Sequence, residues 1–231
     1  MRHRLDHAPE LLDEARHDPR ELEQSLDQVA EVNRLLGGRR AVWLALEPLL
    51  AASRTTTILD VGTGSGDIPL DLVRRAGDRV RICASDLHPQ MRDIASRRTA
   101  AQPAITVQAA DALALPFDDD AFDIVLLSLT LHHFEEAEQQ AVLGEAARVA
   151  RRAVIINELE RCRANWYGAQ FLARTRWRGN RLTRHDGPLS VLRAFTLPEL
   201  VAMVERAGLR VESAGRRFFY RLVVVADTRR A

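Results

Sequence analysis

The chain has 231 residues, of which 46% are hydrophobic, so it is long and apolar enough to form an α/β domain with a sizeable core and is not disordered throughout. Its net charge of +1 argues against a polyanion-binding surface over the whole chain. Apolar runs no longer than strands predict that no segment spans a bilayer, and two cysteines, Cys83 and Cys162, exclude a disulfide framework or a zinc site.

The N-terminal part of the chain reads as helical. Met1–His7 has no apolar segment behind it and is therefore not a secretory signal, so we expect a cytoplasmic protein. A first helix carries a stripe that includes Leu22 and Leu26 and ends at Gly37-Gly38. A second helix is expected from about residue 40 to residue 52, and Pro48 should end or kink it.

From residue 55 onward, short apolar runs alternate with amphipathic stretches. The predicted strands are Thr56–Val61, Val80–Ser85, Ile105–Ala109, Phe122–Ser128, Ala153–Asn157, Arg210–Ala214 and Phe218–Ala226. The predicted helices are Asp67–Ala76, Pro89–Thr99, Glu136–Val149 and Leu197–Ala207. This alternation favours a parallel sheet with helices on both faces. The last two strands, separated by a turn at Gly215, should form an antiparallel pair.

A glycine-rich turn follows the first predicted strand. Gly62, Gly64 and Gly66 lack a Cβ, so they can adopt positive φ and let a ligand approach the backbone closely. Their G-x-G-x-G spacing differs from the G-x-G-x-x-G of dinucleotide binders, and the G-K-[ST] ending of a phosphate-binding loop is missing. An ordinary structural turn is the alternative explanation.

The segment Asp60–Gly66 (Asp-Val-Gly-Thr-Gly-Ser-Gly) resembles the first motif of the class I S-adenosylmethionine (SAM)-dependent methyltransferases. The resemblance implies their Rossmann-like fold, a mostly parallel seven-stranded sheet with a C-terminal antiparallel strand, and SAM as cofactor. Residues 1–53 should then form an N-terminal helical cap. Residues 54–231 should form the SAM-binding domain, with a basic, lid-like insertion between residues 160 and 195.

Further candidate residues follow successive strands, where ligands of an open parallel sheet are bound. Asp86 can accept both ribose hydroxyls, or it can cap the helix that begins near Pro89. By resemblance, Asp111 contacts the adenine amino group, and the alternative is a turn acid in solvent. Arg40 can be read either as a partner of the SAM carboxylate or as part of a solvated helix start. The expected cofactor-binding residues are Asp60, Gly62, Thr63, Gly64, Gly66, Asp86, Leu87, Asp111, Ala112, Ser128, Leu129, His133 and Arg40.

Methyl transfer from SAM is an in-line attack, so the protein's main task is to position the nucleophile. We expect no metal, because no metal-ligand spacing is visible and, in an extended segment, His132 and His133 would point to opposite faces. If the nucleophile is a phenol or enol oxygen, a nearby base helps. The candidate bases are His132, His133 and His185.

The C-terminal part of the chain is basic. Residues 151–231 hold 17 arginines and 7 acids, and between Arg161 and Arg193 eight arginines stand against one acid. His185-Asp186-Gly187-Pro188 has the composition of a turn. The basic, aromatic helix expected at Asn165–Trp177 fits a lid over the pocket, a membrane-surface helix or, least well, an RNA-binding element.

Two subfamily resemblances bear on the substrate. Val32–Trp43 resembles a segment of the ubiquinone/menaquinone biosynthetic methyltransferases. Arg181–Phe195 resembles small methyltransferases associated with type III polyketide synthases. The leading hypothesis is O-methylation of a hydrophobic phenolic or polyketide-like small molecule in secondary metabolism. The alternatives are C-methylation of a prenylated quinone precursor and a non-catalytic SAM-binding module. Transient membrane-surface contact fits these substrates, and nucleic acid does not.

Overall fold

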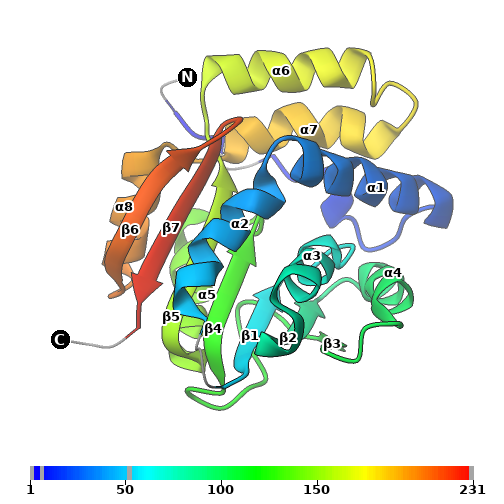
Figure 1. Cartoon of the computed structure of the whole chain (residues 1–231). Coiled ribbons are helices and arrows are strands. Elements are labelled where there is room, and N and C mark those ends of the chain that lie inside the picture. The colour runs from blue at the N-terminus through cyan, green and yellow to red at the C-terminus, as the bar shows by residue number, and fades with distance from the viewer. Residues whose placement is uncertain (1–2, 6–7, 51–53, 229–231) are drawn as a thin grey trace.

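A seven-stranded sheet forms the centre of the fold, in the order β3-β2-β1-β4-β5-β7-β6 (Figure 1). The computed structural model describes residues 3–5, 8–50 and 54–228. The strands β1 to β5 run parallel, and β7 is antiparallel to both β5 and β6. The predicted mostly parallel sheet with a C-terminal antiparallel strand is therefore confirmed. The strands are β1 (Thr56–Val61), β2 (Val80–Asp86), β3 (Ile105–Ala109), β4 (Phe122–Ser128), β5 (Ala150–Leu159), β6 (Arg210–Arg217) and β7 (Arg221–Asp227).

Helices cover both faces of the sheet. The helices are α1 (Pro19–Leu35), α2 (Gly38–Leu46), α3 (Asp67–Ala76), α4 (Pro89–Thr99), α5 (Glu136–Val149), α6 (Arg163–Arg174), α7 (Arg181–Arg193) and α8 (Leu197–Arg206). Successive strand residues point to opposite faces. Leu59 and Val125 therefore share one core with α5 and α8, while Ile58 and Ile124 share the other with α2 and α3. Burial on both faces explains why the central strands are continuous apolar runs.

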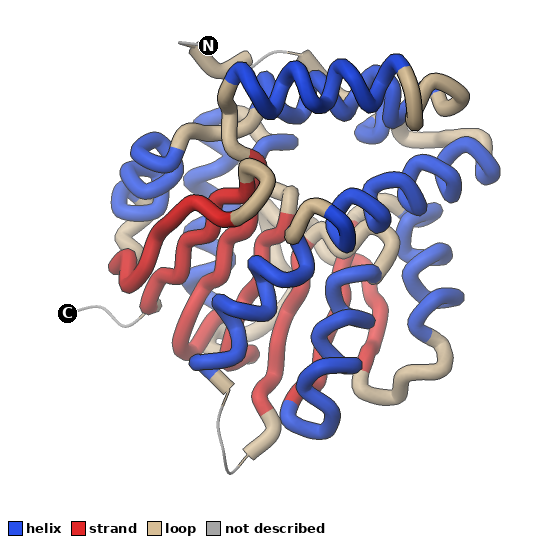
Figure 2. The backbone as a smooth tube through the Cα atoms, turned by 45° about the horizontal axis from the view of Figure 1, so that its top comes forward, coloured by secondary structure: helices blue, strands red, loops and turns tan. Residues whose placement is uncertain are grey.

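A third group of elements lies across the carboxyl ends of the parallel strands, and Figures 1 and 2 show α1, α6 and α7 there. Leu22 and Leu26 of α1 pack against Met91 and Ile94 of α4. Behind them, α6 and α7 share a smaller apolar cluster with Trp177. This layer closes the space above the strand ends, where the predicted ligand residues are found.

The sequence-based placement of the last turn is wrong. Gly215 lies inside β6, and the chain turns at residues 218–220 instead. Phe219 and Tyr220 adopt left-handed backbone conformations, with φ of 54° and 59°. Composition misled here because aromatic residues rarely occupy such positions, which glycine and asparagine favour.

The turn predicted at residues 185–188 is also wrong, because these residues lie within α7. The tertiary structure explains the unusual helix composition. Gly187 faces Trp177, and a Cβ at that position would lie 2.4 Å from the indole ring. The Asp186 carboxylate accepts the backbone N–H groups of Leu11 and Leu12, at 2.8 and 2.9 Å. Glycine is thus needed for close packing, and aspartate for docking the N-terminal segment.

Other boundaries also differ from prediction. The second helix, α2, ends at Leu46 and is followed by a 3₁₀ turn, η2 (Glu47–Leu49), which contains Pro48; residues 51–53 of the predicted helix lie outside the described residues. β5 continues to Leu159, so Glu158 is part of the strand rather than of the loop after it. Among the described residues, no helix has the length and apolarity needed to cross a membrane.

Candidate functional site

The glycine loop between β1 and α3 is shaped by its neighbours. Gly62 has φ of 73°, and a Cβ there would lie 2.9 Å from Thr130 Oγ1. The backbone N–H groups of Gly62 and Thr63 donate to Ser85 O at 2.9 and 2.8 Å. The loop is therefore held against the ends of β2 and β4, and its glycines are required both by backbone conformation and by space.

Asp86, at the end of β2, is the central acid of this loop. Its two carboxylate oxygens accept the backbone N–H groups of Gly64 and His88, both at 2.9 Å. Each oxygen keeps a further lone pair. Asp86 is buried, and this burial raises its pKa. An ionised Asp86 would therefore be better satisfied when it also accepts hydroxyl groups of a bound ligand.

Asp60 and Asp67 add negative charge beneath the loop. Burial, together with the nearby carboxylates of Asp67 and Asp86, raises the pKa of Asp60 to about 7. Arg39 binds Asp67 through Nε at 3.0 Å and partly offsets this charge. Three close carboxylates at one end of a pocket favour a ligand that carries positive charge.

A cavity of about 1560 Å³ extends from this loop to α6 and α7. It brings together eleven of the thirteen residues predicted to bind the cofactor. Two predicted residues do not line the cavity: Gly66, which caps α3, and Arg40, whose side chain is exposed. The members of the predicted set that line the cavity are Asp60, Gly62, Thr63, Gly64, Asp86, Leu87, Asp111, Ala112, Ser128, Leu129 and His133.

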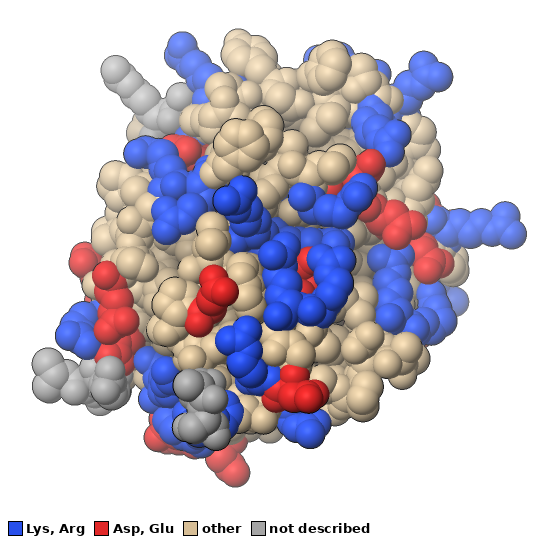
Figure 3. Space-filling model, in the orientation of Figure 1, with Lys and Arg blue, Asp and Glu red and all other residues tan. Residues whose placement is uncertain are grey.

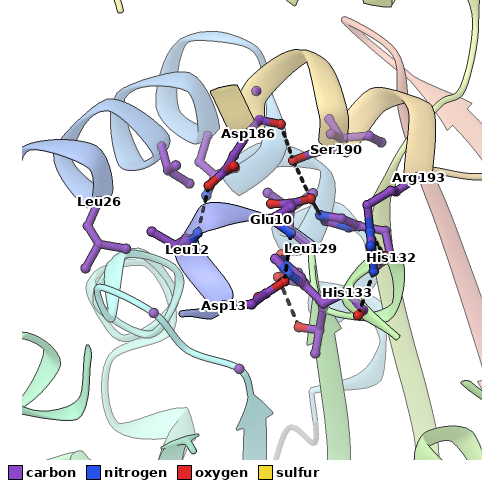
Figure 4. A pocket seen from close by; sticks show the side chains of 18 of the residues that line it. Glu10, Leu12, Asp13, Leu26, Leu129, His132, His133, Asp186, Ser190 and Arg193 are labelled. Atoms are coloured by element: carbon purple, nitrogen blue, oxygen red, sulfur yellow. Dashed lines mark hydrogen bonds and ion pairs between the residues drawn. The ribbon is translucent and has the colours of Figure 1, made fainter. Parts of the chain in front are cut away.

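His132 lies in the opposite wall, on the 3₁₀ turn η4 (Leu131–His133) (Figure 4). Its Nδ1 is 2.7 Å from Glu158 Oε2, and the Leu131 N–H donates to Glu158 Oε1 at 2.8 Å. An ionised carboxylate can only accept, so Nδ1 donates in this pair and Nε2 is the ring nitrogen that faces other partners. That Nε2 lies 3.7 Å from Glu10 Oε1. Both His132 and Glu158 are buried.

His133 pairs with a different carboxylate. Its Nδ1 is 2.9 Å from Asp13 Oδ1 of η1 (Leu11–Asp13). Burial lowers the pKa of His133, but Glu10, Asp13 and Glu158 together raise it to about 9. At neutral pH His133 is therefore an imidazolium that can donate hydrogen bonds, which is a different state from that of a free base.

The two histidines do not point to opposite faces as predicted for an extended segment, because the 3₁₀ turn places their rings 4.4 Å apart. Within the described ranges, Glu10, His132 and His133 form the one group whose potential metal-ligand atoms all lie within 4.8 Å of one another. The ring planes are tilted by only 32°. The two histidines and Glu10 thus present their polar atoms to one point of the cavity wall, contrary to the expectation from an extended segment.

His185, the third predicted base, is not brought to the cavity. Its side chain is half exposed, and its Nδ1 is 2.7 Å from Asp186 Oδ1. It supports the carboxylate that docks η1, and η1 in turn carries Glu10 and Asp13. His185 therefore helps to hold in place the part of the cavity wall that carries Glu10 and Asp13.

The basic segment also proves partly structural. Arg193 is buried and donates through Nε to His132 O at 2.8 Å and through a terminal nitrogen to His133 O at 2.7 Å. Arg161 is likewise buried and pairs with Glu199. These two guanidinium groups hold the histidine turn and the segment between α7 and α8 in place, so neither is free to receive an acidic substrate.

Sequence reasoning missed Glu10 and Asp13 as wall residues. They carry no motif and lie about 120 positions before their histidine partners. Glu158 was noticeable as an acid near the end of a strand, but only the structure pairs it with His132.

Comparisons with known proteins agree with one another. Residues 58–153 match a family model described as a methyltransferase domain. The demethylmenaquinone methyltransferase of Thermus thermophilus is 43% identical over 112 residues, which cover 48% of this chain and 47% of that protein. The demethylmenaquinone methyltransferase of Thermobifida fusca is 31% identical, covering 58% of each chain. The chain thus spans about half the length of the curated relatives it matches.

Among solved structures, a SAM-dependent methyltransferase from Aquifex aeolicus matches with a TM-score of 0.68 and 20% identity, covering 93% of this chain and all of that one. The [4+2]-cyclase SpnF matches with a TM-score of 0.62 and 16% identity, covering 84% and 81%. At these identities the likeness shows the fold alone. The fold does not by itself establish which reaction occurs.

Proposed function

We propose that this chain, which contains a class I SAM-dependent methyltransferase domain, transfers a methyl group from SAM to a ring carbon of a prenylated quinone precursor. The family model and the curated relatives support the methyltransferase family predicted from the glycine loop, and with it SAM as cofactor. The leading hypothesis from the sequence was O-methylation of a phenolic compound. The curated relatives, named for demethylmenaquinone and ubiquinone/menaquinone methylation, favour the C-methylation alternative.

The residues around the glycine loop fit SAM. Asp86 offers lone pairs for the ribose hydroxyls, and the glycines leave room for close approach of a nucleoside. The carboxyl groups of Asp60 and Asp67 beneath the loop suit the positive charges of the cofactor. When bound, SAM supplies an electrophilic methyl group on a positively charged sulfur. Asp111 and Ala112 would border the adenine, as the family resemblance implies.

The observation that carries the proposal is that one cavity joins this loop to the wall of His132 and His133. A reduced quinone has two ring hydroxyls. His132 Nε2 would accept the proton of one hydroxyl, and Glu158 would stabilise the resulting imidazolium. Deprotonation would make the adjacent ring carbon electron-rich, and the cavity would position this carbon in line with the methyl group that SAM would supply.

After attack, the methylated ring carbon must lose its hydrogen as a proton to restore aromaticity. His132 would pass the hydroxyl proton from Nε2 to the Glu10 carboxylate, 3.7 Å away, and Nε2 would then be free to accept the proton from the ring carbon. His133, held as an imidazolium by Asp13, would donate a hydrogen bond to a substrate oxygen and stabilise its negative charge.

The direct test is incubation with methyl-labelled SAM and a reduced demethylmenaquinone with a short prenyl chain. A panel of alkylresorcinols and flavonoids should run beside it. We expect label as C-methyl on the quinone. Label as O-methyl on a phenol would instead support the O-methylation hypothesis. Retention of SAM without label on any acceptor would favour a non-catalytic module.

A cytoplasmic location is also part of the proposal. It is supported by the two cysteines, Cys83 and Cys162, which are both free.

A further inference from the structure

The rim of the cavity exposes an unusual number of aromatic side chains. On α6, Tyr167 and Phe171 have exposed fractions of 64% and 66%. On the turn between β6 and β7, Phe218, Phe219 and Tyr220 have exposed fractions of 73%, 43% and 38%. Large apolar side chains gathered in this way mark an interaction surface, whereas isolated ones need no explanation. We call these five residues the aromatic rim.

The two parts of the aromatic rim are neighbours. The N–H of Glu160, three residues before α6, donates to Tyr220 O at 2.7 Å. The turn also reaches the joint between α1 and α2, where a Cβ on Gly37 would lie 3.5 Å from Phe218 O. Phe171, Phe219 and Tyr220 line the cavity itself. The rim is therefore continuous with the mouth of the substrate pocket.

The sequence of α6 presents two distinct faces. Ala169 and Ala173 are buried in the cluster that α6 shares with α7. Arg163, Tyr167 and Phe171 follow one another at intervals of four residues and lie on the exposed face, and Arg174 follows one turn later. A stripe of aromatic and arginine side chains on a helix that holds no acid is typical of helices that lie in the headgroup region of a bilayer.

The turn shows the same preference for aromatic side chains. Phe219 and Tyr220 occupy left-handed conformations, which disfavour residues with a bulky side chain. Residues held in such conformations cluster at functional sites. Here the conformation directs two aromatic rings to the mouth of the cavity, which a standard asparagine-glycine turn would leave bare.

The charge around the rim is positive. Figure 3 shows tan side chains over α6 at the top of this face, with arginines beside and below them. In the part of the chain that the structure describes, Arg163 and Arg217 make no ion pair. Guanidinium groups around an apolar patch complement the phosphates of lipid headgroups.

We propose that the aromatic rim, with Arg163 and Arg217, docks on a phospholipid surface that contains anionic headgroups, and that the lipophilic substrate enters the cavity from the bilayer at this point. The docking surface deepens the proposed function, because it rests on a prenylated, membrane-dissolved substrate. The docking surface includes part of the helix for which the sequence suggested contact with a membrane surface.

Vesicle co-flotation without any substrate tests the docking separately from the reaction. Vesicles of equal parts phosphatidylcholine and phosphatidylglycerol should bind the protein. The double variant Tyr167→Ser/Phe218→Ser should bind about tenfold or more weakly. These two residues do not line the cavity, so SAM affinity and turnover of a short-chain substrate in solution should stay unchanged. Leu44→Ser, an exposed apolar residue of α2, is the matched control.

The charge component has its own variant. Arg163→Gln/Arg217→Gln should weaken binding to the anionic vesicles about tenfold and leave weak binding to pure phosphatidylcholine unchanged. Arg81→Gln, at the far end of β2, should have no effect. The proposal is overturned if the folded wild-type protein does not bind the anionic vesicles, or if the aromatic double variant binds them as tightly as wild type. Absent methyl transfer with intact vesicle binding would instead count against the proposed function alone.

Discussion

The glycine loop and the histidine wall face each other across one cavity, but they are assembled from very different lengths of chain. On the cofactor side, Gly64 and Asp86 are 22 positions apart and follow adjacent parallel strands. On the substrate side, Asp13 meets His133 across 120 positions, and Asp186 docks Leu11 across 175. The cofactor side is thus fixed by the sheet itself, whereas the substrate side depends on segments from both halves of the chain.

This difference suggests that the two sides can be damaged separately. Changes at the loop should impair cofactor binding, and changes at the wall should impair turnover. Four substitutions test that contrast, from the largest expected effect to the smallest.

His132→Gln should lower turnover by about 10²–10⁴-fold, which is the usual contribution of a positioned acid or base. Glutamine keeps a hydrogen-bond donor for buried Glu158 but cannot accept and release a proton at the position of Nε2. SAM affinity, measured by calorimetry, should change little. His3→Gln is the matched control, and its turnover should stay near wild type because this histidine is exposed and does not line the cavity. A His132→Gln variant with near-normal turnover would remove the proposed base.

Asp86→Ala should weaken SAM binding by about 10- to 100-fold, since hydrogen bonds to a charged group contribute about 1.5–3 kcal/mol. The loss has two origins, the missing acceptor and the released N–H of Gly64. Calorimetric titration measures it. Asp118→Ala, an exposed acid before β4, should bind SAM normally. Unaltered SAM affinity in Asp86→Ala would contradict the assignment of this end of the cavity to the cofactor.

Gly62→Ala should lower the free energy of unfolding by about 1–3 kcal/mol, because the new Cβ would meet Thr130 in a left-handed conformation. The same substitution at Gly144, in α5 with open space around it, should instead stabilise by up to about 1 kcal/mol. Urea denaturation of the pair measures both. Equal effects at the two glycines would show that the loop geometry is not constrained as described.

His133→Gln should flatten the pH dependence of stability. The folded pKa of about 9 lies above the ordinary value of 6.5, so the stabilising contribution is complete below pH 6.5 and is lost as the pH rises through 9. The wild-type melting temperature should therefore fall by a few degrees more than that of the variant between these limits. Thermal melts across that range measure the slope. Parallel slopes for wild type and His133→Gln would contradict the raised pKa that Glu10, Asp13 and Glu158 give His133.

Much of the sheet could be predicted because both of its faces are buried. Buried strands such as β1 and β4 are unbroken apolar runs, and their helical connections require a parallel arrangement. The strand ends then fall at one edge, so Asp60, Asp86 and Asp111 could be grouped from the sequence alone. The loop glycines were recognisable for a similar reason, since their spacing reflects a local backbone requirement.

Composition failed where contacts between distant segments decided the local structure. Residues 185–188 are helical because Gly187 fits against Trp177 and Asp186 binds the N-terminal turn. The hairpin turns at Phe219 and Tyr220, which no turn propensity favours. In both places a long-range contact or a functional surface outweighs the local preference.

By itself, therefore, the amino-acid sequence determined the order of the strands and of the helices that connect the parallel strands, the glycine loop and the acids at the strand ends, since all of these depend on periodicity and on near neighbours. Only the tertiary structure decided which carboxylates pair with His132 and His133, that His185 lies outside the cavity, and that the aromatic rim surrounds its mouth. Those outcomes depend on the docking of the N-terminal segment and of α6 and α7 over the strand ends, a packing of distant segments that leaves no periodic trace in the chain.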